Sequence, residues 1–185
     1  MFEELFLFVK SPVYTKDPNE QLQYRCIRIA KLLVLSIGLS LILLTVASTL
    51  QTLFKIEIGK HAIDDLFENN SPIIILLLAV IVAPVLEELI FRAPLKWFRS
   101  SPYFRIIFYV FAICFGVVHL TNFEITPQVL ALAPVLVAPQ ISIGILLGFV
   151  RVRFGLLWSI TMHGLYNLIL IGPLLILRIL EIPIE

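Results

Sequence analysis

Five long apolar stretches alternate with short polar segments along the chain. They cover approximately residues 28–54, 72–99, 104–121, 127–150 and 154–177. About 20 apolar residues are enough for an α-helix to cross the roughly 30 Å hydrocarbon layer of a membrane. A helix also satisfies its own backbone hydrogen bonds inside lipid. The pattern therefore predicts an all-α, multi-pass transmembrane helical bundle of about five spans.

The ends of these stretches predict the domain organisation. Residues 1–27 begin with the acidic, amphipathic segment MFEELFLFVK, and we expect a cytoplasmic or interfacial N-terminal arm there. Residues 28–185 then form a single transmembrane domain. Within it, Pro134 and Pro139 interrupt the fourth stretch. Because proline lacks a backbone N–H, this span is expected to be kinked or broken.

Composition supports the lipid environment. Hydrophobic residues make up 59% of the 185 residues, charged residues only 15%, and the mean hydropathy is +1.00. Soluble domains carry about 25% charged residues, and a chain of this size cannot hide such an apolar excess in one core. The expected partner is therefore the lipid bilayer. A net charge of +1 gives no indication of a nucleic-acid partner. Cys26 and Cys114 match no metal-ligand spacing, and Cys114 is predicted to be a small core residue.

Basic residues predict the orientation. Ten lie on the side of the N-terminus: Lys10, Lys16, Arg25, Arg28, Lys31, Lys96, Arg99, Arg105, Arg151 and Arg153. Three lie on the opposite side: Lys55, Lys60 and Arg178. Because cytoplasmic loops carry the excess of lysine and arginine, the N-terminus is predicted to be cytoplasmic and the C-terminus outside. Trp97 fits an interfacial anchor at the inner end of the second span.

Polar residues interrupt three of the spans: Glu87, Glu88 and Arg92 in the second, His119 in the third, and His163 and Asn167 in the fifth. Ionisable groups at membrane depth cost at least about 2.5 kcal/mol each and persist mainly where they pair or serve a pathway or reaction. At 1.5 Å per residue, Glu87, His119, His163 and Asn167 lie roughly 15–22 Å from the predicted inner ends of their helices. They share one depth provided that the second helix continues to Arg99.

Spacing predicts which side chains can meet. His163 and Asn167 are four residues apart and lie on one side of their helix. Glu88 and Arg92 have the same spacing and can form an ion pair within theirs. Glu87 projects about 100° away from that pair and is left to face another helix. Such a cluster could simply tie helices together through hydrogen bonds. A carboxylate, two imidazoles and an amide at one depth favour a reaction site instead.

These residues resemble a known family. The patterns EExxxR at 87–92, FxxxH at 115–119 and HxxxN at 163–167 are similar to those of the CPBP family, also called Abi, which comprises the CAAX-protease and bacteriocin-processing intramembrane proteases. The resemblance, to type II CAAX prenyl endopeptidases in particular, covers about residues 72–170. Each motif lies inside an apolar stretch, so the three in order make a more specific signal than any one alone.

The resemblance implies intramembrane hydrolysis of a peptide bond in a membrane-associated peptide or protein. It makes Glu87 the base that activates water with help from His119, while His163 and Asn167 stabilise the oxyanion. Arg92 then holds Glu88 and orients the span. No cofactor is required by this scheme. If a metal takes part, Glu87, His119 and His163 could supply three zinc ligands, with water as the fourth.

Two other functions stay open. A catalytically silent family member could act as a membrane regulatory or immunity protein, and the same ionisable residues would also suit an ion- or proton-coupled carrier. An odd number of spans without inverted repeats argues against the carrier. The sequence does not distinguish a prenylated tail from a leader peptide as substrate. His61 beside Asp64 and Asp65 is expected to be solvated, and Gln140, Asn122 and Tyr166 could line a cavity or hydrogen-bond structurally.

Overall fold

The computed structural model describes residues 1–56 and 69–180, and every long element in these ranges is a helix. Five helical segments are long and apolar enough to cross a membrane: Leu22–Phe54, Pro72–Lys96, Phe104–Asn122, Pro127–Arg153 and Leu156–Ile179. Each overlaps one predicted stretch. The expected all-α, multi-pass bundle of five spans is confirmed. Lys60, His61, Asp64 and Asp65 lie outside the described residues.

The first span is α2 (Leu22–Phe54), which begins earlier than predicted, so that Arg25 and Arg28 lie in its first turns. It ends at Lys55, whose left-handed conformation (φ 51°) is a common helix stop. A short helix, α1 (Phe2–Lys10), precedes it.

The second span is not one regular helix. It consists of α4 (Pro72–Leu76), the π-helix η1 (Leu77–Val82), α5 (Ala83–Phe91) and the 3₁₀ helix η2 (Ala93–Lys96). The predicted continuation of a regular helix to Arg99 is therefore wrong. Pro94 explains the early end, because proline has no N–H to donate and disfavours the α-conformation in the residue before it.

The remaining spans follow the prolines and glycines of the sequence. The third is α6 (Phe104–Val118) with the 3₁₀ helix η3 (His119–Asn122) at its end. The fourth breaks at Val137 into α7 (Pro127–Leu136) and α8 (Ala138–Arg153), which confirms the predicted interruption. The fifth, α9 (Leu156–Ile179), follows a tight turn at Gly155, where φ is 104° and glycine is strongly favoured.

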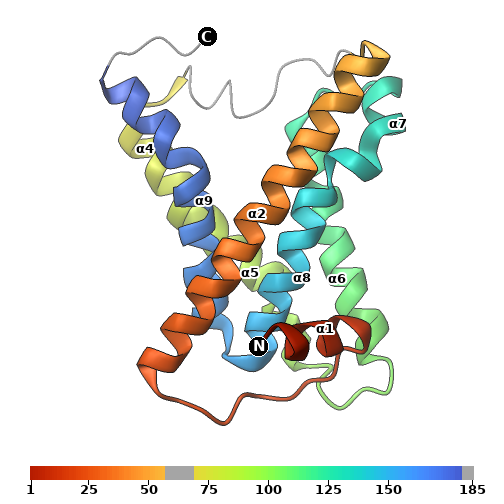
Figure 1. Ribbon diagram of the computed structural model, residues 1–185, viewed down its shortest axis with the longest axis vertical. Helices are drawn as coiled ribbons and strands as arrows, with labels where there is room; N and C mark the ends of the chain where they lie inside the picture. Colours follow the sequence, from red (N-terminus) through yellow and green to blue (C-terminus); the bar gives the residue numbers. More distant parts are fainter. Residues whose placement is uncertain (57–68, 181–185) are drawn as a thin grey trace.

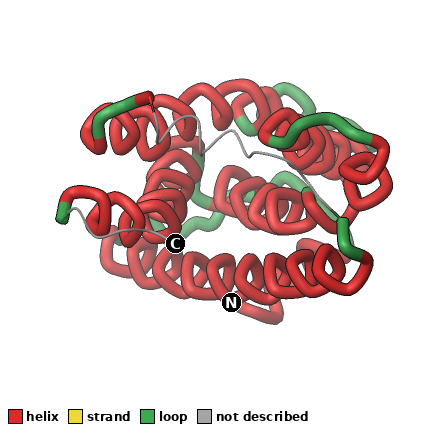
Figure 2. The backbone as a smooth tube through the Cα atoms, turned by 90° about the horizontal axis from the view of Figure 1, so that it is seen from above, coloured by secondary structure: helices red, strands yellow, loops and turns green. Residues whose placement is uncertain are grey.

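Helix α8 is the central packing element. It contacts α6, α2 and α9, and all of its residues from Leu146 to Val152 are buried. Gly144 and Gly148 allow the close approach to α6, since a Cβ at Gly148 would lie 2.6 Å from the Phe108 ring. Small residues four apart commonly allow such close packing between membrane helices. Toward the end away from α1, α4 and α9 diverge from α2 and α7 (Figure 1), and the view from above shows the helices in more than one layer (Figure 2).

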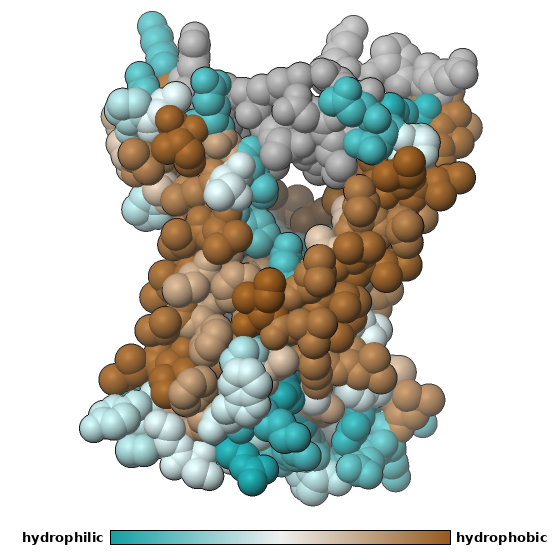
Figure 3. Space-filling view, turned by 180° about the vertical axis from the view of Figure 1, so that it is seen from behind, coloured by the Kyte–Doolittle hydropathy of each residue, from teal (hydrophilic) through white to brown (hydrophobic). Residues whose placement is uncertain are grey.

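Apolar side chains cover the middle of the molecule, as a membrane-spanning chain requires. Figure 3 shows this belt on one face, with polar residues at both ends. Cys114 belongs to the exposed surface of α6, so the prediction that it is a core residue is wrong. Hydropathy alone does not say which side of a membrane helix faces lipid, because both sides are apolar. Trp97 is 79% exposed just after η2, where an interfacial anchor was expected.

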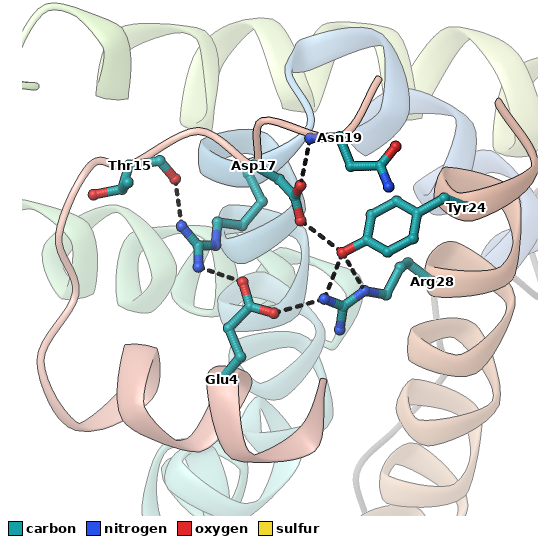
Figure 4. Close-up of polar contacts among 7 residues, drawn as sticks. Glu4, Thr15, Asp17, Asn19, Tyr24 and Arg28 are labelled. Atoms are coloured by element: carbon teal, nitrogen blue, oxygen red, sulfur yellow. Dashed lines mark hydrogen bonds and ion pairs between the residues drawn. The ribbon is translucent and has the colours of Figure 1, made fainter. Parts of the chain in front are cut away.

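The N-terminal arm is fixed across one end of the bundle. Phe8 of α1 packs edge-on against the rings of Phe108 and Phe149, each 5.1 Å away between centroids. Glu4 accepts hydrogen bonds from Arg28 of α2 and from Arg153 of α8. Figure 4 shows Glu4 within a network of polar contacts that continues through Tyr24 to Asp17 and Asn19.

Candidate active site

Helix α5 carries Glu88 into the interior, where its side chain is fully buried. One turn later Arg92 Nε lies 3.5 Å from Glu88 Oε1, so the predicted ion pair within the helix is confirmed. Arg92 is also 98% buried. Its guanidinium carbon lies 3.8 Å from the centroid of the Phe115 ring, and its Nη2 donates to the Gly144 carbonyl at 3.4 Å. The arginine thus links α5 to α6 and α8.

Helix α9 brings two further donors to Glu88. The Ser159 hydroxyl donates to Glu88 Oε2 at 2.5 Å, and His163 Nδ1 donates to Oε1 at 3.1 Å. Because a carboxylate only accepts, Nδ1 of His163 carries a hydrogen. A buried carboxylate is tolerated when it is paired and hydrogen-bonded in this way. Ser159 is not among the site residues predicted from the sequence, although it lies one turn before His163 on the same helix face.

Glu87 has a different environment from its neighbour. Its side chain is 28% exposed, and its Oε2 lies 3.5 Å from His163 Nε2. The His163 imidazole therefore lies between two carboxylates, one fully buried and one reaching a more open space. Glu87 faces another helix, as the 100° offset from Glu88 predicts.

His119 stands where α6 ends. Its Nδ1 donates to the Phe115 carbonyl at 2.8 Å, which leaves Nε2 of the neutral ring as an acceptor. The Phe115 ring lies 4.7 Å from the His119 ring and 5.8 Å from the His163 ring, between centroids. Within residues 1–56 and 69–180, no hydrogen bond or ion pair joins Glu87 to His119. The common depth of these two residues assumed a second helix continuing to Arg99, and α5 ends at Phe91.

Asn167 donates a hydrogen bond to the backbone of η1. In this π-helix the N–H of Ala83 bonds to Leu78 O instead of Ala79 O. Pro84 has no N–H, so it cannot replace that bond from five residues away. The Ala79 carbonyl is thereby left without a backbone donor, and Asn167 Nδ2 donates to it at 2.8 Å.

Gly164, inside the third motif, allows α9 to approach η1 closely. A Cβ at this position would lie 2.7 Å from the Val80 carbonyl oxygen. Pro84, four residues after Val80, cannot donate the α-helical hydrogen bond to that carbonyl. Gly164 and Asn167 together place α9 against η1, and His163 comes with them. Gly164 is a further residue of the site that the sequence did not predict.

The structure thus joins Glu87, Glu88, Arg92 and His163 directly, and connects His119 to them through the Phe115 ring. Tyr166, considered as a cavity residue, forms a 2.6 Å hydrogen bond with Ser40 that ties α9 to α2.

The sequence left open a zinc site formed by Glu87, His119 and His163. Among the described residues, no group of three or more His, Cys, Asp or Glu side chains is placed to hold a metal ion. The three residues therefore do not form a ligand set in this arrangement, and no step proposed below passes through a metal.

The fold and this cluster define a multi-pass membrane protein with a polar centre built from several spans. A family model described as type II CAAX prenyl endopeptidase Rce1-like matches residues 69–169, more than half of the chain and all three motifs. The chain belongs to this family, and at the family level it is an intramembrane CAAX endopeptidase. No curated protein and no solved structure matches it.

Proposed function

We propose that the protein hydrolyses one peptide bond of a membrane-associated peptide or protein, with Glu87 as the base. The observation that carries this proposal is the contrast between the two adjacent carboxylates on either side of His163. Glu88 is buried and engaged with Arg92, Ser159 and His163, whereas Glu87 is 28% exposed and lies 3.5 Å from the far edge of the imidazole. Of the two carboxylates, Glu87 is therefore the one that water can reach.

The proposed reaction begins when Glu87 takes a proton from water and the water oxygen attacks the scissile carbonyl carbon. His119 Nε2, an acceptor in the neutral ring, orients that water. His163 Nε2–H and the Asn167 amide donate to the resulting oxyanion, and each such donor contributes about 10²–10³ to the rate. Glu87 then passes the proton to the amine nitrogen as the C–N bond breaks.

These roles require particular hydrogens on His163 and Asn167. For His163 to donate from Nε2 while Nδ1 donates to Glu88, the ring must carry both hydrogens. Its positive charge and that of Arg92 then balance the two carboxylates. The Asn167 amide has two hydrogens, of which one bonds to Ala79 O, so the second is left for the oxyanion.

The test is cleavage by the purified protein in liposomes, followed by mass spectrometry. The panel contains a prenylated C-terminal peptide, the same peptide without the lipid, and a leader-type peptide. We expect cleavage of at least one membrane-associated peptide and its loss in His163→Ala. A chelator added to the same assay tests metal dependence, and preserved activity supports the metal-free scheme. A folded protein that cleaves no peptide, or one that takes up protons instead, would refute the proposal.

Within that panel we propose the prenylated peptide as the preferred substrate, because the family description names prenyl endopeptidases. Faster cleavage of the prenylated peptide than of its unprenylated match supports this choice. Equal rates, or a preference for the leader-type peptide, contradict it.

We also propose that the N-terminus is cytoplasmic, on the basis of the ten-to-three distribution of basic residues. Cys26 is exposed near the N-terminal end of α2 and provides a probe. A membrane-impermeant maleimide should label it in inside-out vesicles but not in intact cells, with Cys26→Ser as the control. Labelling in intact cells would show that the N-terminus lies outside and would contradict this proposal.

A further inference from the structure

A cavity of about 520 Å³ opens at the end of the bundle where the N-terminal arm lies. Its walls come from the arm, from the start of α2, from η2 and from the turn between α8 and α9. Five basic side chains line it: Lys16, Arg25, Lys96, Arg151 and Arg153. Asp17 and Glu20 are its acidic ones. The proposed active-site residues are not part of this wall.

Some of this charge is already neutralised. Arg153 pairs with Glu4 and donates to the Thr15 carbonyl, and Arg25 Nη2 lies 3.8 Å from Glu20. Lys16 and Lys96 are exposed at the cavity and form no ion pair among the described residues.

Arg151 is the residue that points to a ligand. It is only 7% exposed, yet its three described bonds go to neutral acceptors: the carbonyls of Arg92 and Ala93, and the Tyr14 hydroxyl. Within residues 1–56 and 69–180, no carboxylate lies within ion-pair distance of its guanidinium. A buried cation without a counter-ion is costly, and an anion in the adjoining cavity would remove that cost.

The position of the cavity indicates which kind of anion would bind there. It lies where helices of four spans begin or end, and Trp97, 79% exposed, stands on its wall. Tryptophan at this level marks the boundary between lipid and water. Basic pockets between helices at that boundary bind anionic lipid headgroups.

We propose that this cavity binds the phosphate of an anionic phospholipid headgroup, with Arg151 as the buried ligand and Lys16 and Lys96 at the rim. The lipid would hold η2 and the α8–α9 turn in place. The same chemistry would accept free phosphate, so the experiment has an arm for each source.

Native mass spectrometry of the purified protein measures retention of phosphatidylglycerol against phosphatidylcholine. We expect preferential retention of phosphatidylglycerol, weakened roughly fivefold by each of Lys16→Gln and Lys96→Gln. Lys10→Gln removes an exposed lysine outside this wall and should change nothing. Arg151→Gln should abolish the preference. Because this variant loses internal bonds as well, unfolding temperatures of both proteins are measured without ligand, with phosphatidylglycerol and with inorganic phosphate. The rise induced by phosphatidylglycerol should disappear in Arg151→Gln.

Three results would overturn the proposal. The first is equal retention of the two lipids by the unmodified protein. The second is an equal loss in Lys10→Gln and Lys96→Gln, which would indicate nonspecific attraction by surface charge. The third is stabilisation by inorganic phosphate that phosphatidylglycerol does not reproduce, which would assign the cavity to a free anion.

Discussion

Glu88 is a charged side chain with no exposed surface, and three neighbours make this possible. Arg92 supplies the opposite charge, while Ser159 and His163 donate hydrogen bonds from α9. Such a carboxylate has no room for substrate or water. Its role is structural: it orients His163 and holds α5 against α9. The neighbouring Glu87 is the residue to which we assign the chemistry.

Replacing Glu88 should therefore damage the fold. Glu88→Gln leaves Arg92 buried without its counter-ion, and breaking such a pair costs about 3–5 kcal/mol. We expect a large fall in unfolding temperature, measured in detergent. Ser159→Ala removes one donor but no charge and should cost less, about 1–3 kcal/mol. Glu88→Gln that unfolds at the original temperature would show that the pair does not stabilise the bundle.

At the scale of elements, the π-helix η1 and helix α9 hold each other in position. Pro84 of α5 cannot donate to the carbonyls of η1, and the Ala79 carbonyl instead accepts a hydrogen bond from Asn167 of α9. Gly164 makes room for the neighbouring Val80 carbonyl. The distance from α9 to η1 in turn places His163 beside Glu87.

A methyl group at Gly164 should separate these elements. Gly164→Ala puts a Cβ 2.7 Å from Val80 O, so α9 must shift away from η1. We expect lower stability and a loss of cleavage activity larger than the loss of folded protein. Gly172→Ala is the matched control in α9: its Cβ would meet only Leu168 at 3.9 Å, and alanine favours the helix by about 1 kcal/mol. Equal activity in the two variants would contradict the proposed contact.

The spans could be predicted from the sequence because lipid demands long apolar helices, and hydropathy reports those directly. The Glu88–Arg92 pair followed from its spacing of four. The π-helix η1 could not be predicted, since it depends on Pro84 together with Gly164 and Asn167, which lie far along the chain in α9. Ser159 and Gly164 were missed because neither is ionisable. The predicted depth of Glu87 relied on a regular helix continuing to Arg99, and Pro94 ends that helix early.

At the scale of the whole molecule, the N-terminal arm closes one end of the bundle. Glu4 pairs with Arg28 of α2 and Arg153 of α8, so one carboxylate connects the arm, the first span and the fourth. All three side chains are at most 25% exposed, which protects the pairs from full solvent screening. The arm therefore belongs to the folded structure rather than being a loose extension.

Removing this carboxylate should release the arm. We expect Glu4→Gln to lower stability by about 1.5–3 kcal/mol, the range for hydrogen bonds to charged groups. Limited proteolysis should then cut the arm faster than in the unmodified protein. Glu3→Gln changes an exposed glutamate in the same turn and should leave the cleavage rate as it was. Equal rates for both variants would show that Glu4 does not hold the arm.

The central claim is that Glu87, and not the buried Glu88, activates water. The most direct measurement is the peptide cleavage rate of Glu87→Gln in liposomes, together with its unfolding temperature. The account predicts a rate at least about 100-fold lower in a protein that still folds, since general-base catalysis contributes about 10²–10⁴. The unfolding temperature should fall much less than in Glu88→Gln, because Glu87 is 28% exposed. A folded Glu87→Gln protein that cleaves at the original rate would contradict it.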